Sequence, residues 1–114
     1  MARIGFGLGY GAFMDAREIA GWMKQAEERG FELGFFSETI ELMRDSVTAL
    51  AAIGLATTKL RLGSTQTVRL RSPVVMAQTL ATLDELTGGR MTLAPGTCTS
   101  ATLAATHSSR STPR

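Results

Sequence analysis

The sequence has very few residues of the kinds that build cross-links or metal sites. It contains one cysteine, Cys98, and one histidine, His107. A lone cysteine cannot form an internal disulfide, so the framework of small secreted domains is missing and a reducing cytoplasm is the expected location. Metal sites built from imidazole or thiolate need several such ligands close together. We therefore expect no metal site.

Long apolar runs and clusters of charge are missing as well. The longest stretch without charge, residues 91–109, is dominated by Thr, Ser and Ala, which makes it too polar to cross a bilayer. The start of the chain reaches Asp15 and Glu18 before any cleavage-like pattern, unlike a signal peptide. The 12 basic residues are scattered and give a net charge of only +2. We expect neither a membrane nor a nucleic-acid partner.

What the sequence does contain is a repeated unit of strand and helix. The runs with an apolar, strand-like pattern are residues 3–9, 33–37, 60–64 and 91–94. Equivalent positions, Ile4, Leu33, Leu62 and Met91, follow one another at intervals of 29 residues. Parallel strands need a crossover connection, usually a helix, and about 30 residues per unit give a (β/α)8 barrel of about 250 residues. The spacing predicts an α/β fold, a partial (β/α)8 TIM barrel of about four βα units with parallel strands.

The connecting segments carry the start and stop signals of helices. Asp15, Asp45 and Ser72 stand where N-caps are needed, with a proline after Ser72. Gly30 and the pair at 88–89 stand where helices end. The stripes expected to face the sheet are Ile19, Trp22, Met23 and Ala26, then Val47, Leu50, Ala51 and Leu55, then Met76, Leu80 and Leu83.

The composition changes after Gly96. Residues 97–114 contain nine Ser or Thr residues, no acidic residue and one large aliphatic residue, Leu103. So little apolar surface cannot offset the entropy that ordering the segment would cost. We expect one folded domain over residues 1–96 and a disordered tail over residues 97–114.

The glycines near the start allow two interpretations. Gly7, Gly9 and Ala12 fit the G-x-G-x-x-A form of the dinucleotide fingerprint, and Glu38 at the end of the next strand would bind a ribose hydroxyl. This interpretation predicts a Rossmann-type nicotinamide dehydrogenase. However, the helix begins only after Asp15, and a negative cap repels phosphate. We favour the other interpretation, in which the glycines allow close packing at a barrel strand.

Four stretches resemble the luciferase-like monooxygenases and their deazaflavin-dependent relatives. Residues 26–38, AEERGFELGFFSE, resemble the family's A-E-x-x-G-F stretch, which ends in glutamate. Residues 60–64, LRLGS, are similar to its third strand, and residues 71–73, RSP, to the R-x-P that starts its third helix. Residues 82–90, TLDELTGGR, match the T-L-D-x-L-S-G-G-R run before the fourth strand, and the resemblance covers residues 1 to about 96.

The resemblance implies a (β/α)8 barrel with reduced flavin mononucleotide (FMN) or a deazaflavin coenzyme in the mouth formed by the carboxyl ends of the strands. Active sites of this fold lie at those ends. The cofactor-binding residues that we predict are Gly9, Glu38, Ser64, Thr65 and Thr97. In the family, a bulge at the end of the third strand supports the isoalloxazine ring, and Ser64–Thr65 occupies that position here. No catalytic residue is predicted.

Glu38 has a structural interpretation beside the functional one. A carboxylate at a strand end often caps a helix or forms an ion pair, and Arg69 and Arg71 are the candidate partners here. Many relatives have a histidine directly after this acidic residue, whereas this chain has Thr39. A proton-transfer role for imidazole at this position therefore does not carry over. Cys98 lacks a basic partner that would activate its thiol.

Three functional hypotheses follow. The first is a flavin- or deazaflavin-dependent oxidoreductase or monooxygenase of the luciferase-like family, short of a full barrel, which positions the cofactor and a small organic substrate. The second is a non-catalytic fragment, or a half-barrel that only self-associates into a homo-oligomer, because four strands leave two open edges. The third is the Rossmann dehydrogenase.

Overall fold

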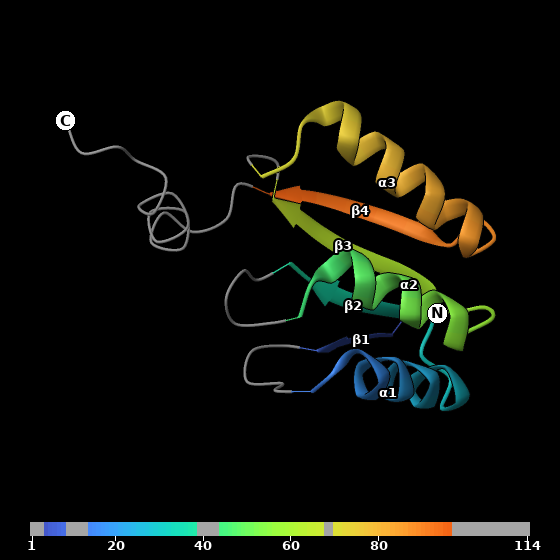
Figure 1. Ribbon diagram of the computed structural model, residues 1–114. Coiled ribbons are helices and arrows are strands. Elements are labelled where there is room, and N and C mark those ends of the chain that lie inside the picture. Colours follow the sequence, from blue (N-terminus) through green and yellow to red (C-terminus); the bar gives the residue numbers. More distant parts are fainter. Residues whose placement is uncertain (1–3, 9–13, 39–43, 68–69, 97–114) are drawn as a thin grey trace.

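Strands and helices alternate along the chain in the computed structural model, which describes residues 4–8, 14–38, 44–67 and 70–96 (Figure 1). The elements are β1 (Gly5–Leu8), α1 (Ala16–Glu28), β2 (Leu33–Ser37), α2 (Ser46–Ala56), β3 (Arg61–Thr67), α3 (Pro73–Leu86) and β4 (Met91–Gly96). The tail expected at 97–114 lies outside the described residues, so its disorder stays a prediction.

The four strands form one parallel sheet in the order β1-β2-β3-β4. Gly5 lies opposite Leu33, and Leu62 lies opposite Met91, so the register follows the expected repeat to within one residue. In a Rossmann fold the first strand lies inside the sheet, beside the switch point. Here β1 is at the edge and pairs with β2 alone among the described strands. The alternative of a Rossmann dehydrogenase is therefore wrong.

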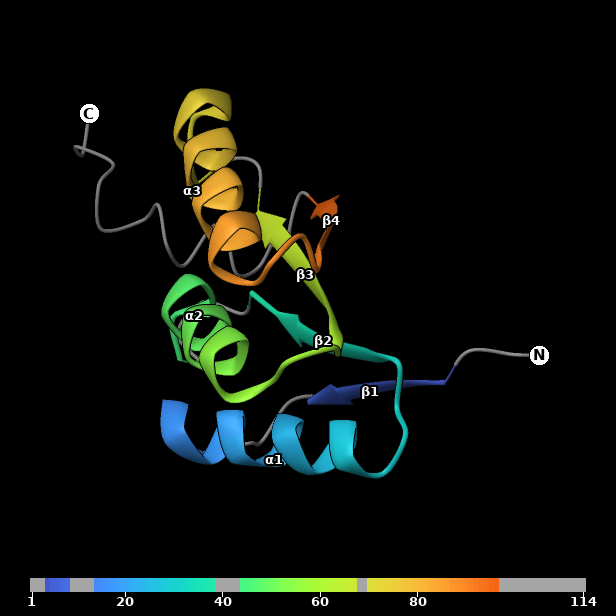
Figure 2. The same ribbon diagram turned by 90° about the vertical axis from the view of Figure 1, so that its right-hand side faces the viewer.

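All three helices cover the same face of the sheet, which curves around the opposite, concave side (Figure 2). The core between the layers consists of Ile19, Met23, Phe36, Leu50, Ile53, Leu60 and Leu62, together with smaller side chains. Gly34 allows α1 to approach this closely, because a Cβ there would lie 2.8 Å from the Met23 sulfur. A curved parallel sheet with helices on its convex face is part of the wall of a (β/α)8 barrel.

The local signals for helix ends act as expected. The side chains of Asp15 and Asp45 each accept a hydrogen bond at 2.9 Å from the backbone N–H three residues later. The Ser72 hydroxyl accepts from the Val75 N–H at 3.2 Å. Gly30 follows α1 with a φ of 92°, a conformation that favours glycine. Within the described residues, no helix has the length and apolar character needed to cross a membrane.

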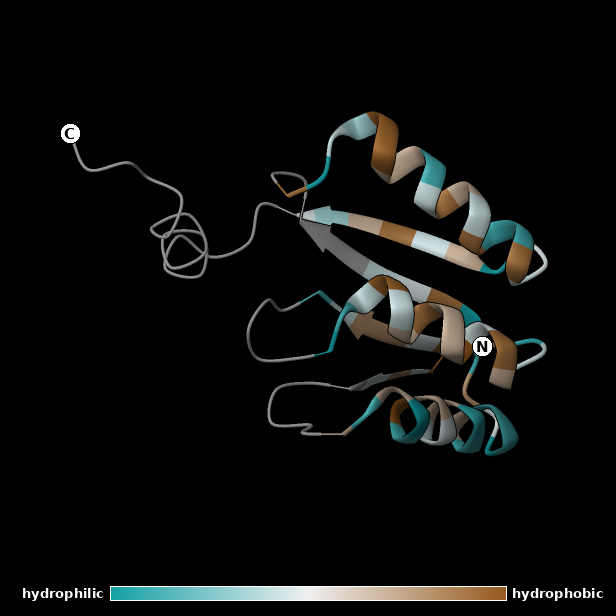
Figure 3. Ribbon diagram, in the orientation of Figure 1, coloured by the Kyte–Doolittle hydropathy of each residue, from teal (hydrophilic) through white to brown (hydrophobic). Residues whose placement is uncertain are grey.

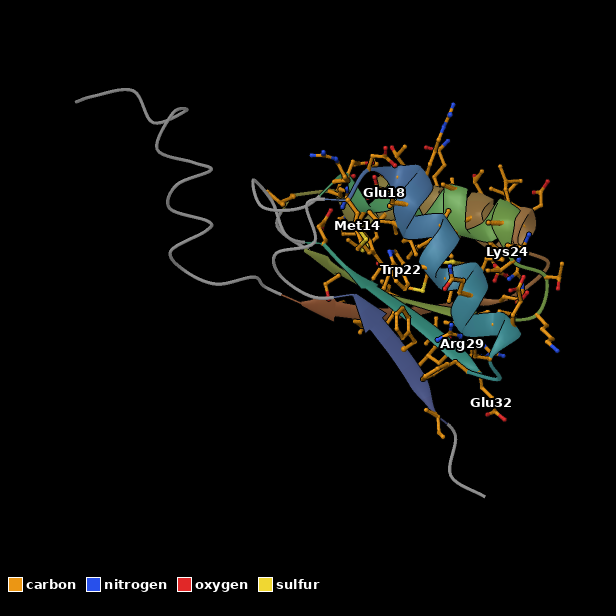
Figure 4. All side chains as sticks on the ribbon, turned by 90° about the horizontal axis from the view of Figure 1, so that it is seen from below. Met14, Glu18, Trp22, Lys24, Arg29 and Glu32 are labelled. Atoms are coloured by element: carbon orange, nitrogen blue, oxygen red, sulfur yellow. The ribbon has the colours of Figure 1, made fainter. Side chains whose placement is uncertain are left out.

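The helix faces differ from the expected stripes in two places. Trp22, labelled in Figure 4, is 48% exposed, and Ala20 is buried in its place. In α2, Leu55 is 73% exposed whereas Ile53 and Gly54 are buried. The reason is that most residues of α2 are apolar (SVTALAAIGLA), so their pattern does not single out one face; Figure 3 shows the apolar colouring of the side in view. Gly54 is buried because α2 meets the segment after α3 there, with a Thr87 methyl group 2.6 Å from the place of a Cβ.

Candidate functional site

The carboxyl ends of the four strands lie along the same edge of the sheet, where all the arrowheads point in Figure 1. This arrangement follows from parallel pairing, and it gathers the residues that end each strand or follow it. We call this region the carboxyl edge. Its described residues are Leu8, Ser37, Glu38, 65–67, 70–72 and 94–96.

Glu38 is held in place at the carboxyl edge by two neighbouring loops. It directly follows β2, and its side chain is only 7% exposed. The Arg71 guanidinium forms an ion pair with Oε1 of Glu38, and the Ser46 hydroxyl donates to the same oxygen at 3.3 Å. Arg71 precedes the N-cap of α3, and Ser46 is the first residue of α2. The carboxylate thus joins the end of β2 to the starts of two helices.

Asp45 adds a second negative charge on the other side of Arg71. Its Oδ1 lies 3.9 Å from Nη2 of Arg71. The pKa of Asp45 is lowered, mainly by the hydrogen bond from the Thr48 hydroxyl and next by the one from the Thr48 N–H. Partial burial raises the pKa by a smaller amount, and the positive charge of Arg71 lowers it further. Asp45 therefore stays ionised at neutral pH and holds Arg71 while it caps α2.

The structure confirms the ion-pair interpretation of Glu38, with Arg71 as the partner; Arg69 lies outside the described residues. Removing one member of such a shielded pair would take away the nearest opposite charge of the other member. Arg71 was not among the predicted cofactor-binding residues. The signal that marks it is the R-x-P motif, whose arginine stands directly before the cap and the first-turn proline of α3.

Ser64 and Thr65 lie in an uninterrupted part of β3. Ser64 is fully buried, on the helix-facing side of the sheet with Leu62. Thr65 is the register partner of Ser37 in β2 and of Ala94 in β4. Pairing continues on the β4 side as far as Thr67, so neither neighbour leaves room for an extra residue. The bulge expected at Ser64–Thr65 is therefore wrong.

The concave face carries a feature that the sequence did not reveal. The Phe35 ring of β2 lies over Gly63 of β3, where a Cβ would be 2.5 Å from Phe35 Cδ2. On the other side of β2, Phe35 is the register partner of Gly7. The ring therefore lies between two strands that carry no side chain at its level. The Phe35 ring forms a flat apolar surface two residues before the end of β2, close to the carboxyl edge. We call this surface the apolar floor.

Two of the predicted cofactor-binding residues, Gly9 and Thr97, lie outside the described residues. Their assignment stays a prediction. Of the other three, the structure brings Glu38 and Thr65 to the carboxyl edge and buries Ser64 behind it.

The fold and this edge define the chain as part of a (β/α)8 barrel. The chain matches the model of the luciferase-like monooxygenase family over residues 1–110, and it belongs to this family. The match extends beyond residue 96, where the resemblance of the sequence motifs ends.

Relatives agree with this assignment. A Mycobacterium tuberculosis protein whose name assigns it as a coenzyme F420-dependent oxidoreductase is 35% identical over 96 residues, which is 82% of this chain and 27% of that protein. The coenzyme F420-dependent tetrahydromethanopterin reductase of Methanopyrus kandleri superimposes with a TM-score of 0.83 at 27% identity, over 91% of this chain and 29% of the reductase.

A third relative shows the fold alone. The oxygenating constituent of 3,6-diketocamphane monooxygenase from Pseudomonas putida, solved with FMN, has a TM-score of 0.78 at 17% identity. The match covers 92% of this chain and 32% of that one. The chain thus spans less than a third of the length of each of these three relatives.

Proposed function

We propose that this chain forms part of the coenzyme-binding barrel of a flavin- or deazaflavin-dependent oxidoreductase or monooxygenase acting on a small organic substrate. The observation that supports this most directly is the structure of the carboxyl edge. There the largely buried Glu38 side chain binds Ser46 at the start of α2 and Arg71 just before α3, close to the apolar floor. Active sites of this fold lie at that edge. A cytoplasmic location belongs to the same proposal.

The residues present fit a planar tricyclic coenzyme. Such a ring system needs a flat apolar surface and nearby polar backbone groups, which the Phe35 ring over Gly63 and the ends of β2 and β3 provide. When bound, the coenzyme would accept or deliver a hydride, or activate oxygen, at its ring. The chain would contribute position and the exclusion of water.

The contact residues in this proposal are Thr65, two residues before the end of β3, and Gly9 and Thr97, which follow β1 and β4 in the sequence. Ser64 makes no side-chain contact with the coenzyme in this proposal, because its side chain is fully buried on the helix-facing side of the sheet. Glu38 acts as a positioning residue, since its carboxylate is committed to Arg71 and Ser46. Loss of the Glu38 carboxylate would remove its contacts with Ser46 at the start of α2 and with Arg71 before α3. Coenzyme binding should then weaken, with no change in any acid–base step.

We expect a deazaflavin to bind more tightly than FMN. The Mycobacterium tuberculosis protein, at 35% identity, and the Methanopyrus kandleri reductase, at 27%, carry names that include coenzyme F420. The FMN-bound relative is only 17% identical and supports the fold alone.

The test is a fluorescence titration of the full chain with reduced FMN and with a deazaflavin coenzyme. Saturable binding is expected for the wild type and for a Glu28→Gln control on the exposed surface of α1. Binding at least about tenfold weaker is expected for Glu38→Gln, because one charge of a shielded pair is lost. No saturable binding of either coenzyme, or equal affinity in both variants, would contradict the proposal.

A further inference from the structure

We propose that Phe35 and Ala94 determine the depth and the width of the coenzyme pocket, so that a flat conjugated ring lies directly above Phe35 inside the barrel wall. The proposal rests on the proposed function and adds two specificity-determining residues to it. Both residues belong to the concave face of the sheet, which is the inner face of a (β/α)8 barrel (Figure 2).

The strand register arranges the concave face in levels. Register partners lie at one level and on one face, and alternate residues of a strand lie on opposite faces. Because Phe36 and Leu62 belong to the core beneath the helices, the residues before and after them lie on the concave face. The register places one residue of each strand at the middle level of this face: Gly7, Phe35, Gly63 and Thr92. Phe35 is the one large residue among these four.

The next level toward the carboxyl edge contains no residue larger than threonine. It consists of the register partners Ser37, Thr65 and Ala94. Bulky side chains normally fill the levels of a barrel interior, so this level leaves room for a ligand. Strands rise about 3.3 Å per residue, which puts the two levels about 6.6 Å apart. A ring in contact with Phe35 at about 3.5–4.0 Å fits between them.

The level on the other side of Phe35 is filled. Leu33 and Arg61 are register partners there, and the Arg61 guanidinium donates to the Thr92 hydroxyl at 3.3 Å. A methyl group of Leu33 lies 3.5 Å from the place of a Cβ on Gly63, so Leu33 and Phe35 both lie over that glycine. A ligand that enters from the carboxyl edge therefore stops at the Phe35 ring.

The two glycines beside Phe35 make its ring the whole apolar contact at the middle level. A methyl group on Gly63 would lie 2.5 Å from Cδ2 and 3.0 Å from Cε2 of the ring. Gly7, on the β1 side, adds no side chain either. Aromatic rings attract one another in stacked and edge-to-face arrangements. The size and shape of residue 35 thus decide which ligands gain this contact and how deep they reach.

Ala94 limits the pocket on the side of β4. Its register partner Thr65 pairs in turn with Ser37, so Ala94 lies at the level of the bound ring. A leucine at this position would fill the level as in an ordinary barrel interior. One large apolar side chain below the ring and small residues around it favour flat conjugated ligands over bulkier ones.

The first test compares the same change on the two faces of β2. In a fluorescence titration of the full chain with a deazaflavin coenzyme, Phe35→Leu should weaken binding roughly three- to tenfold, because an aromatic contact is lost. Phe36→Leu is the matched control, since Phe36 is fully buried on the helix-facing side. It should lower stability but keep the affinity of the folded chain within about twofold of the wild type.

The second test fills the pocket. Ala94→Leu should weaken coenzyme binding at least about tenfold, because the new side chain occupies the place of the ring. Ala77→Leu adds the same side chain to the exposed surface of α3 and should leave the affinity unchanged.

A third test separates coenzyme contact from a purely structural role of Phe35. Gly63→Ala displaces the ring and should weaken binding, and adding Phe35→Leu should recover part of the stability but none of the affinity. Recovery of both together would overturn the proposal. So would equal affinities of Phe35→Leu and the wild type, or full affinity of Ala94→Leu, while the proposed function would stand. No binding by the wild type would overturn the proposed function and this proposal with it.

Discussion

Replacing Arg90 with methionine should destabilise the fold strongly, because the Arg90 guanidinium makes five hydrogen bonds. Arg90 ends the TLDELTGGR motif and lies between α3 and β4. Its guanidinium donates to the backbone carbonyls of Gly54, Thr57, Leu60 and Thr87 at 2.6 to 3.1 Å, and to the Thr57 hydroxyl at 2.8 Å. One side chain thus joins the end of α2, the start of β3 and the end of α3.

The size of the effect follows from these contacts. The last carbonyls of a helix have no partner within the helix, and Arg90 supplies one to Gly54 and Thr57. A hydrogen bond to a charged group contributes about 1.5–3 kcal/mol, and water replaces part of it at a half-exposed side chain. For all five bonds together we expect a loss of about 3–4 kcal/mol, a large share of the 5–15 kcal/mol typical of a domain.

Urea unfolding followed by circular dichroism measures this loss. Arg90→Lys keeps the charge without the planar fork and should fall between methionine and wild type. Arg29→Met, at the exposed end of α1, is the matched control and should cost less than about 0.5 kcal/mol. Equal losses for Arg90→Met and Arg29→Met would refute the reasoning.

Three further changes test other parts of the structure. The Glu27 carboxylate accepts from three consecutive N–H groups after α2; burial raises its pKa, but these hydrogen bonds together lower it below the ordinary 4.5. The contribution of Glu27 to the free energy of unfolding is thus complete above pH 4.5 and is lost as the pH falls through the lowered pKa. Glu27→Gln should therefore reduce the loss of stability at acid pH, and an unchanged dependence of stability on pH would contradict this role of Glu27. Gly63→Ala should cost about 1–3 kcal/mol because the new methyl group meets the Phe35 ring, and Phe35→Leu should recover part of it; full tolerance of Gly63→Ala would disprove the packing. Arg71→Met should cost about 3–5 kcal/mol by removing the guanidinium from the shielded Glu38 carboxylate, and adding Glu38→Gln should restore most of it; additive losses in urea unfolding would exclude the coupling.

Local features of this fold could be predicted from the sequence because they depend on neighbours in the chain. The caps at Asp15, Asp45 and Ser72 each bind an N–H three residues away, and Gly30 ends α1 by its own backbone conformation. The strand repeat was equally visible, since each crossover has nearly the same length. The structure confirms the parallel sheet that the repeat predicts.

Features that depend on contacts between distant segments could not be derived in the same way. The exposure of Leu55 depends on how α2 lies between two other helices, and the length of β3 depends on pairing with β4. The Glu38–Arg71 pair joins residues 33 positions apart. Both arginines that organise the structure stand in motifs that the sequence displays, but their partners become visible only in the fold.

The most direct test of the proposed coenzyme site is to map where the coenzyme binds. Backbone amide chemical shifts of the labelled full chain would be compared before and after addition of a deazaflavin coenzyme. The account predicts that the shifted amides cluster at the carboxyl edge, at Ser37, Thr65 and Gly96, with little change at Gly30 and Lys59 at the opposite end of the sheet. Shifts confined to that opposite end, or none at saturating coenzyme, would contradict it.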